Sequence, residues 1–232
     1  MKVYFIGAGP GDPNLLTIKA HKIISTCTVC LFAGSLVPKE IISLAPKEAT
    51  LIDTSNLTLT EIMKEITKAK SNNIDIARVH SGDVSVYGAL SEQINLLEDL
   101  NIEYEIIPGI PAYVAGAALL KTELTVPGEV QSVILTRTSF GSSPMPEGEE
   151  LLNFAKTGST LIIHLSIRRI RYIVRELMPV LGENSTIAIL YRIGWPDEIV
   201  LIDKLKNIVS KVRESKITRT ALIITGKNFK KK

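Results

Sequence analysis

The chain has 232 residues, of which 45% are hydrophobic and 22% charged, with a formal net charge of +3. This length can bury a core in one large or two small domains. The charge is too small for a nucleic-acid footprint and suits a small polyanionic ligand. No apolar run approaches the ~20 residues of a membrane span. Met1 leads directly into a strand pattern without a signal-peptide core, so a cytoplasmic location is expected.

The first half of the chain alternates strand-like runs with stretches of helical periodicity. We expect strands at 3–6, 28–32, 50–53, 75–80 and 104–107, and helices at 15–25, 58–70, 87–100 and 110–120. This alternation predicts a mainly parallel sheet with helices on both faces. The uncharged, alanine- and glycine-rich run 110–120 predicts a helix packed between layers.

The pattern changes after Pro127 and Gly128. We expect strands at 132–136, 160–164, 186–191, 199–203 and 221–225, with fewer helices between them. The sequence Trp195-Pro196-Asp197-Glu198 predicts a hairpin connection and therefore antiparallel pairs. The expected fold class is α/β, with an N-terminal α/β domain at 1–121, a linker at 122–128 and a C-terminal mixed α/β domain at 129–232.

Cys27 and Cys30 form a C-x-x-C pair, a spacing that can indicate a zinc or redox site. Residues three apart on a strand point to opposite faces, so we expect two separate, buried thiols. His21, His80 and His164 are too far apart in sequence to form a helical ligand pair. No metal held by the protein is expected.

A glycine-rich turn, Gly7-Ala8-Gly9-Pro10-Gly11, follows the first strand, where a dinucleotide-binding loop would lie. Its glycine spacing differs from G-x-G-x-x-G, and Pro10 removes a backbone N–H that a pyrophosphate would need. NAD is therefore not expected. A tight turn that needs glycine only for its backbone angles is the alternative.

Two further glycine-bearing turns follow the fourth and fifth expected strands, His80-Ser81-Gly82-Asp83 and Pro108-Gly109-Ile110-Pro111. Open α/β sheets bind ligands at the carboxyl ends of their strands. Asp83 is suited to accept hydrogen bonds from a ribose or an amino group, or alternatively to cap the helix expected near Tyr87. Together the three turns predict a ligand cleft.

With Leu15-Leu16-Thr17 and Lys19-Ala20, these motifs give the whole chain a resemblance to the tetrapyrrole (corrin/porphyrin) methylase family. Several segments resemble the sequences of the branch that methylates carbon 11 of precorrin-4 or cobalt-precorrin-4. These segments are residues 32–37, 135–137, 191–192 with 195–198, and 219–223. The resemblance implies S-adenosylmethionine as methyl donor, S-adenosylhomocysteine as its product and a corrinoid substrate in cobalamin biosynthesis. It also implies that cofactor and substrate lie in a cleft between the two domains, and that the enzyme is a homodimer.

Matching the family's motifs residue by residue implies a cofactor pocket lined by Pro10, Gly82, Asp83, Val86, Pro111, Ala112, Leu165 and Ala221. Pro111 occupies a position where family members often have Thr or Ser, so a side-chain hydroxyl contact is lost there. Leu165 occupies a position where many members have Met. For the substrate carboxylates, guanidinium groups are the natural partners. The substrate-binding candidates are Arg137, Arg192 and Arg219, together with Asp53 and Ser55.

Each candidate arginine, taken singly, is better explained as a solvated charge, and Asp53 has the alternative of capping a turn. Arg168, Arg169 and Arg171 form a further basic cluster after a strand of the second half. Methyl transfer from a sulfonium is an in-line displacement that depends on positioning, so no catalytic dyad is expected and no general base is named.

Three alternative functions are also compatible with the sequence. The first is another tetrapyrrole methylase, acting on uroporphyrinogen III or a different precorrin. The second keeps the fold but acts on ribosomal RNA ribose or makes diphthine, although the acidic run typical of the RNA enzymes after the second strand is missing here. The third, from a different class, is a non-catalytic nucleotide-binding domain.

Overall fold

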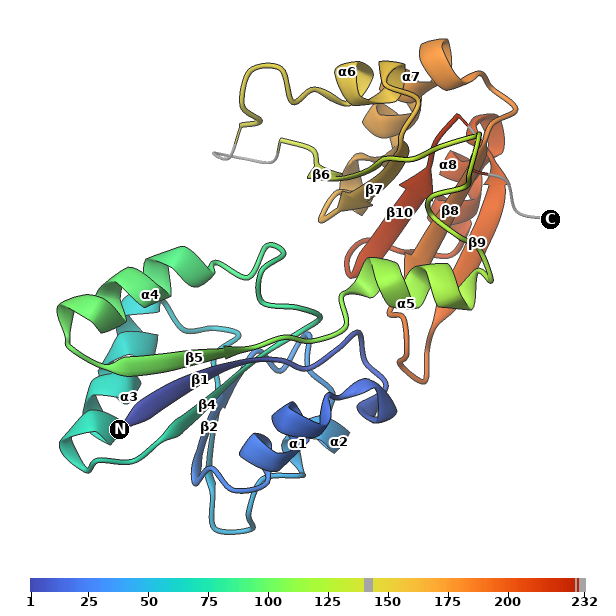
Figure 1. Cartoon of the computed structure of the whole chain (residues 1–232). Helices are drawn as coiled ribbons and strands as arrows, with labels where there is room; N and C mark the ends of the chain where they lie inside the picture. The colour runs from blue at the N-terminus through green and yellow to red at the C-terminus, as the bar shows by residue number, and fades with distance from the viewer. Residues whose placement is uncertain (140–143, 228, 230–232) are drawn as a thin grey trace. The chain divides into compact units, whose positions relative to one another are not determined.

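A computed structural model describes residues 1–139, 144–227 and 229. Contacts within the chain divide it into two compact units, Met1–Ala112 and Tyr113–Lys232. Each unit is built on one five-stranded sheet with helices packed against it (Figure 1). Residues 122–128 fall inside the second unit, and the boundaries of independently folding domains stay a prediction.

The sheet of the first unit is entirely parallel, in the order β3-β2-β4-β1-β5. Its strands are β1 (Lys2–Gly7), β2 (Val29–Phe32), β3 (Thr50–Asp53), β4 (Ile76–His80) and β5 (Glu103–Ile107). All five strand predictions are confirmed, each to within one residue at either end. Since parallel neighbours run in the same direction, all five carboxyl ends lie along one edge of this sheet.

Helices cover both faces of the parallel sheet, as the alternating pattern predicted (Figure 1). One face packs against α1 (Ile18–Ile24) and α2 (Lys39–Ile42), and the other against α3 (Leu59–Ser71) and α4 (Leu90–Asp99). Successive side chains of β1 point to opposite faces of the sheet. Phe5 therefore packs against α3, and Ile6 packs against α1. The helix expected from Tyr87 begins only at Leu90, since Tyr87 and Ala89 have positive φ angles.

The sheet of the second unit is mixed, in the order β6-β7-β10-β8-β9. Its strands are β6 (Val133–Arg137), β7 (Thr160–His164), β8 (Thr186–Tyr191), β9 (Ile199–Lys204) and β10 (Ala221–Thr225). β6 and β7 are parallel, whereas β10 is antiparallel to β7 and β8, and β8 is antiparallel to β9. The predicted hairpin around Trp195 is confirmed as the β8–β9 connection.

The expectation of fewer helices in the second half is confirmed for the described residues, with three α-helices after residue 128 against five before it. α6 (Leu151–Lys156), α7 (Ile170–Leu181) and α8 (Leu205–Glu214) pack on one face of the second sheet. The other face contacts α5 (Ala112–Leu119) through Gly116, where an added Cβ would lie 2.7 Å from Leu190 Cδ1. Val114 of the same helix is exposed, so the expected burial of α5 between layers is confirmed on one side only.

Among the described residues, no helix combines the length and apolar character needed to cross a membrane.

Cys27 and Cys30 are free, buried thiols, but the expectation that they face opposite sides of the sheet is wrong. Cys27 precedes β2 rather than belonging to it, and both side chains pack into the cluster beneath α1 and α2. Burial raises the pKa of Cys27 to about 11 and that of Cys30 to about 12. Both groups are therefore protonated at neutral pH.

We expect both thiols to resist an aromatic disulfide reagent in the folded chain at mildly alkaline pH. The thiolate is the reacting species, and only about a thousandth of a thiol is ionised three pH units below its pKa. Denaturant exposes the groups and restores ordinary pKa values, so both should then react quickly. Absorbance of the released chromophore measures this, and rapid labelling of the folded chain would contradict the burial of these groups.

Candidate functional site

Three loops of the first unit meet where β1, β4 and β5 end. Gly9 and Gly82 exchange backbone hydrogen bonds with N···O distances of 3.1 and 2.7 Å. A Cβ added to Gly109 would lie 2.3 Å from the carbonyl oxygen of Gly82 and 2.5 Å from that of Gly7. Only glycine permits this approach of three backbones. Gly7, Gly82 and Gly109 thus form a three-glycine seam that brings together the three turns predicted from the sequence.

Asp83 fastens this seam. Its Oδ2 accepts a hydrogen bond from the Gly109 backbone N–H at 2.8 Å, and its Oδ1 accepts bonds from the backbone N–H and hydroxyl of Ser85. Partial burial pushes the pKa of Asp83 upward, but these three bonds outweigh it and lower the pKa below its usual value. The carboxylate is therefore ionised, and it joins the loop after β4 to the loop after β5. The alternative that Asp83 caps α4 is wrong, because that helix begins at Leu90 without a side-chain cap.

Asp53 repeats the arrangement at the end of β3. Its Oδ1 accepts hydrogen bonds from the backbone N–H of Ser55 at 2.9 Å and the Ser55 hydroxyl at 2.5 Å. The same oxygen accepts a bond from the backbone N–H of Gly34, in the loop after β2, at 2.9 Å. The Ser55 hydroxyl, followed by the backbone N–H groups of Gly34 and Ser55, lowers the pKa of Asp53. Two Asp-x-Ser clasps, Asp53–Ser55 and Asp83–Ser85, thus each tie one loop of this edge to a neighbouring loop.

A buried arginine that the sequence did not single out supports the loop after β4. Arg78 is 6% exposed, and it donates to Gln93 Oε1 at 3.2 Å and Thr54 Oγ1 at 3.0 Å. Gln93 in turn donates to the carbonyl of Ala89 at 3.0 Å, and Ala89 is one of the two residues of this loop, with Tyr87, that have positive φ angles. Burial lowers the pKa of Arg78 to about 10, so it stays charged.

His80 lies directly before this loop, at the carboxyl end of β4. Its Nε2 is buried without a hydrogen-bond partner in the described part of the chain. Burial, and then the nearby charge of Arg78, lower the pKa of His80 to about 3. Its imidazole is therefore neutral at physiological pH and a poor proton acceptor. Burial likewise lowers the pKa of His164, at the end of β7, to about 4.

The structure places five of the predicted cofactor residues on the three loops of the seam and the sixth at the start of α5: Pro10, Gly82, Asp83, Val86 and Pro111, then Ala112. Gly82 has φ +66°, and a Cβ there would be 3.8 Å from Pro111 Cα. The loops after β4 and β5 therefore lie against each other at the positions that the sequence pattern selected.

The other two predicted cofactor residues, Leu165 and Ala221, lie together at one edge of the second sheet. β7 and β10 are antiparallel and pair Ile163 with Ile223, so Leu165, directly after β7, and Ala221, the first residue of β10, lie at the same edge of the sheet. Leu165 is 72% exposed and has φ +53°. Non-glycine residues in this conformation cost roughly 1–3 kcal/mol and cluster at functional sites.

Ser166 holds this strained edge in place. Its hydroxyl donates to the carbonyl of His164 at 2.6 Å and accepts from the backbone N–H of Thr138, just after β6, at 2.8 Å. Arg192 and Thr220, at the ends of β8 and β10, also have positive φ angles, and a 3.0 Å backbone hydrogen bond joins them. Three strained residues thus line one edge of the second sheet.

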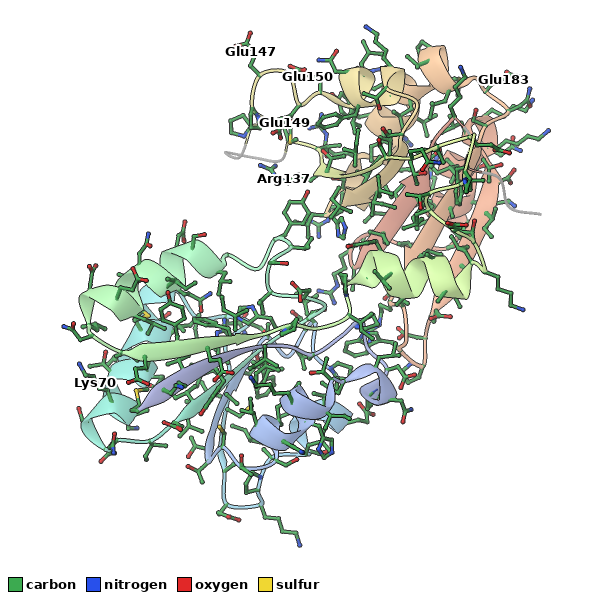
Figure 2. All side chains as sticks on the ribbon, viewed as in Figure 1. Lys70, Arg137, Glu147, Glu149, Glu150 and Glu183 are labelled. Atoms are coloured by element: carbon green, nitrogen blue, oxygen red, sulfur yellow. The ribbon has the colours of Figure 1, made fainter. Side chains whose placement is uncertain are left out.

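The three arginines predicted to bind substrate also lie at this edge, and they differ in their hydrogen-bond and ion-pair partners. Arg137 lies at the end of β6 (Figure 2). Its guanidinium donates to the carbonyls of Thr138 and Pro144. Arg192 forms a 2.7 Å ion pair with Asp197 and stacks on Trp195, with the guanidinium carbon 3.8 Å from the ring centroid. Arg219 is exposed. Within the part of the chain that the structure describes, groups of three or more His, Cys, Asp or Glu side chains suited to a metal ion are absent.

A family model described as Tetrapyrrole (Corrin/Porphyrin) Methylases matches residues 2–209. The chain belongs to the tetrapyrrole methylases. This tetrapyrrole methylase is 46% identical to a precorrin-4 C(11)-methyltransferase of Sinorhizobium sp, and the match covers 97% of this chain and 89% of the relative. It is 42% identical to a cobalt-precorrin-4 C(11)-methyltransferase of Methanocaldococcus jannaschii, over 97% of this chain and 87% of the relative.

Solved structures confirm the predicted fold class of this tetrapyrrole methylase. The X-ray structure of a cobalt precorrin-4 methyltransferase matches with a TM-score of 0.93 at 34% identity, over 97% of this chain and 94% of that chain. A uroporphyrin-III C-methyl transferase from Thermus thermophilus, complexed with S-adenosyl homocysteine, matches with a TM-score of 0.81 at 23% identity, over 97% of both chains. The second likeness shows the shared fold.

Proposed function

We propose that the chain transfers a methyl group from S-adenosylmethionine to carbon 11 of precorrin-4 or cobalt-precorrin-4, giving precorrin-5 or cobalt-precorrin-5 in cobalamin biosynthesis. The observation that carries this proposal is the near full-length identity of 42–46% to relatives named for that reaction. The metal-free and the cobalt substrate are both represented among these relatives, so the proposal covers both.

The seam of the first unit supports a role in holding the cofactor. Bound S-adenosylmethionine supplies an activated methyl group on a sulfonium. Gly82, with its positive φ, and the adjacent Pro111-Ala112 backbone offer main-chain contacts that need no side-chain hydroxyl. A carboxylate has about four acceptor positions, and protein donors use three on Asp83. We infer that Asp83 acts mainly by fixing the loops that Gly82 and Pro111 belong to.

We expect Asp83→Ala to weaken binding of S-adenosylhomocysteine roughly tenfold or more, because hydrogen bonds to a charged group contribute about 1.5–3 kcal/mol. Asp12→Ala is the matched control. The Asp12 carboxylate accepts hydrogen bonds from the backbone and side chain of Asn14, within its own turn before η1 (Pro13–Leu15). Its replacement should change affinity much less. Calorimetric titration measures both, and a larger loss for Asp12→Ala would contradict this division of roles.

The edge of the second unit supports a role in binding an acidic, apolar ring system. Leu165 presents an exposed apolar side chain at the edge where Ala221 also lies. Arg219 comes two residues before Ala221, and its side chain forms no hydrogen bond or ion pair with the residues that the structure describes. Arg219 is thus ready for a substrate carboxylate, whereas Arg192 must first exchange Asp197 for it. We propose that Asp53 and Ser55 shape the Gly34–Ser35 loop rather than bind acidic groups, since like charges repel.

Orientation, rather than proton transfer, then provides the rate of the proposed reaction. The backbone seam, the Asp-x-Ser clasps and Ser166 are fixed contacts that hold their loops before any ligand arrives. His80 does not act as a base, since its low pKa leaves it with little affinity for a proton. What remains for the chain is to align an electron-rich ring carbon with the methyl donor and to exclude water.

The decisive experiment incubates the chain with S-adenosylmethionine and either precorrin-4 or cobalt-precorrin-4. Mass spectrometry should find one added methyl group, and NMR of the product should place it on carbon 11. A methyl group at another carbon would assign a different tetrapyrrole methylase activity. Tight cofactor binding without transfer to any tetrapyrrole would instead favour a nucleotide-binding domain.

We further propose that the enzyme is a homodimer and acts in the cytoplasm, as the family resemblance implies. Light scattering at micromolar concentration should give twice the mass of the 25.4 kDa chain. A monomer under those conditions would contradict the dimer.

A further inference from the structure

A groove on the second unit has a basic rim that the proposed reaction does not use. It lies between the start of α7 and the end of α8 and has a volume of ≈ 520 Å³. Apolar side chains, among them Ile170, Val209 and Ile217, form its floor. Four cations line it: Arg168, Arg171, Arg213 and Lys216. Its size falls within the range of small-molecule sites.

The four cations lack the acidic partners that neighbouring lysines have. On α8, which carries Arg213, Lys206 pairs with Glu183 at 3.0 Å and Lys211 pairs with Asp203 at 2.7 Å. The groove has no acidic lining residue, and its four cations form no ion pair with any residue that the structure describes. Four like charges around one hollow repel each other, so a bound anion would relieve a cost already present in the fold.

One of these cations is held in position by the chain itself. The Arg168 Nε donates to the carbonyl of Thr218 at 3.1 Å, although the two residues are fifty apart in sequence. This bond joins the segment before α7 to the segment before β10. The groove is thus built from two fixed segments rather than from independent surface side chains.

The groove also opens beside the edge that carries Leu165 and Ala221. Ile167 comes two residues after Leu165, and Thr218 comes three residues before Ala221. Three residues of chain span at most about 11 Å. A molecule in the groove is therefore close to the proposed substrate edge but occupies a different surface.

We propose that this groove is a second binding site for carboxylated tetrapyrroles, distinct from the edge at which methyl transfer occurs. The four cations take carboxylates of the ligand, and the apolar floor takes one side of its ring. The ligand class rests on the proposed function, because an apolar macrocycle with acidic arms matches both parts of the groove. A compact inorganic anion would leave the floor uncovered.

The test uses uroporphyrin III, a stable porphyrin polycarboxylate, with the full chain saturated with S-adenosylhomocysteine. Phenylglyoxal modifies accessible arginines, and peptide mass spectrometry reports each site. Uroporphyrin should protect Arg171 and Arg213, and its octamethyl ester should not. Arg175 is the matched internal control, since it lies on α7 outside the groove lining and pairs with Glu176. Absence of protection, or equal protection of Arg175, would overturn the proposal.

Variants sharpen the test. R171Q/R213Q removes two rim charges, and its affinity for uroporphyrin at this site should fall about tenfold or more, whereas R175Q should bind as the unmodified chain does. Protection by poly-glutamate but not by uroporphyrin would assign the groove to an acidic polypeptide and overturn the proposal. Methyl transfer is measured with S-adenosylmethionine on a portion of the same chain to which no S-adenosylhomocysteine has been added. Transfer without protection rejects the groove site alone, and protection without transfer rejects the proposed function alone.

Discussion

The contact of three glycine backbones at the ends of β1, β4 and β5 is the constraint on which the proposed site depends. Gly7, Gly82 and Gly109 approach so closely that a methyl group added to Gly7 or Gly109 would overlap a carbonyl oxygen, while Gly82 has a positive φ angle that favours glycine. This contact fixes where each loop leaves the sheet, and the positions of Pro10, Asp83 and the Pro111 segment follow from it. Because glycine has no side chain, the backbone itself forms the wall of the proposed cofactor site.

Ionised carboxylates then hold the flanking loops with little added bulk. The Asp53 and Asp83 clasps use the same three-residue unit, in which a serine two positions later turns the carboxylate toward a glycine N–H of the next loop. The charge is retained because the bonds favour the ionised form. In the second unit, a neutral hydroxyl, that of Ser166, does the equivalent work between β6 and β7.

Patterns that are local in sequence predicted most of the fold. Inner strands such as β4 and β7 give a clear signal because their apolar runs are buried on both faces of the sheet. The three turns are placed correctly because parallel strands end at a common edge. α7 was overlooked although Ile170, Ile173 and Leu177 have helical spacing. The bond between Asp83 and Gly109 spans 26 residues and leaves no local signal, so the sequence predicts ligand contact or helix capping for Asp83 but not this loop closure. The modest charge of +3 likewise concealed how four cations gather at one groove.

The strand order of the first sheet has a consequence for synthesis on the ribosome. β1 pairs only with β4 and β5, so the first strand to emerge has no partner until residues 76–80 and then 103–107 have followed it. Loop closure over such separations slows folding and leaves an apolar strand unpaired meanwhile. The glycine-rich turn after β1 is therefore among the first segments made, but it can reach its final form only after Gly109 has been added to the chain.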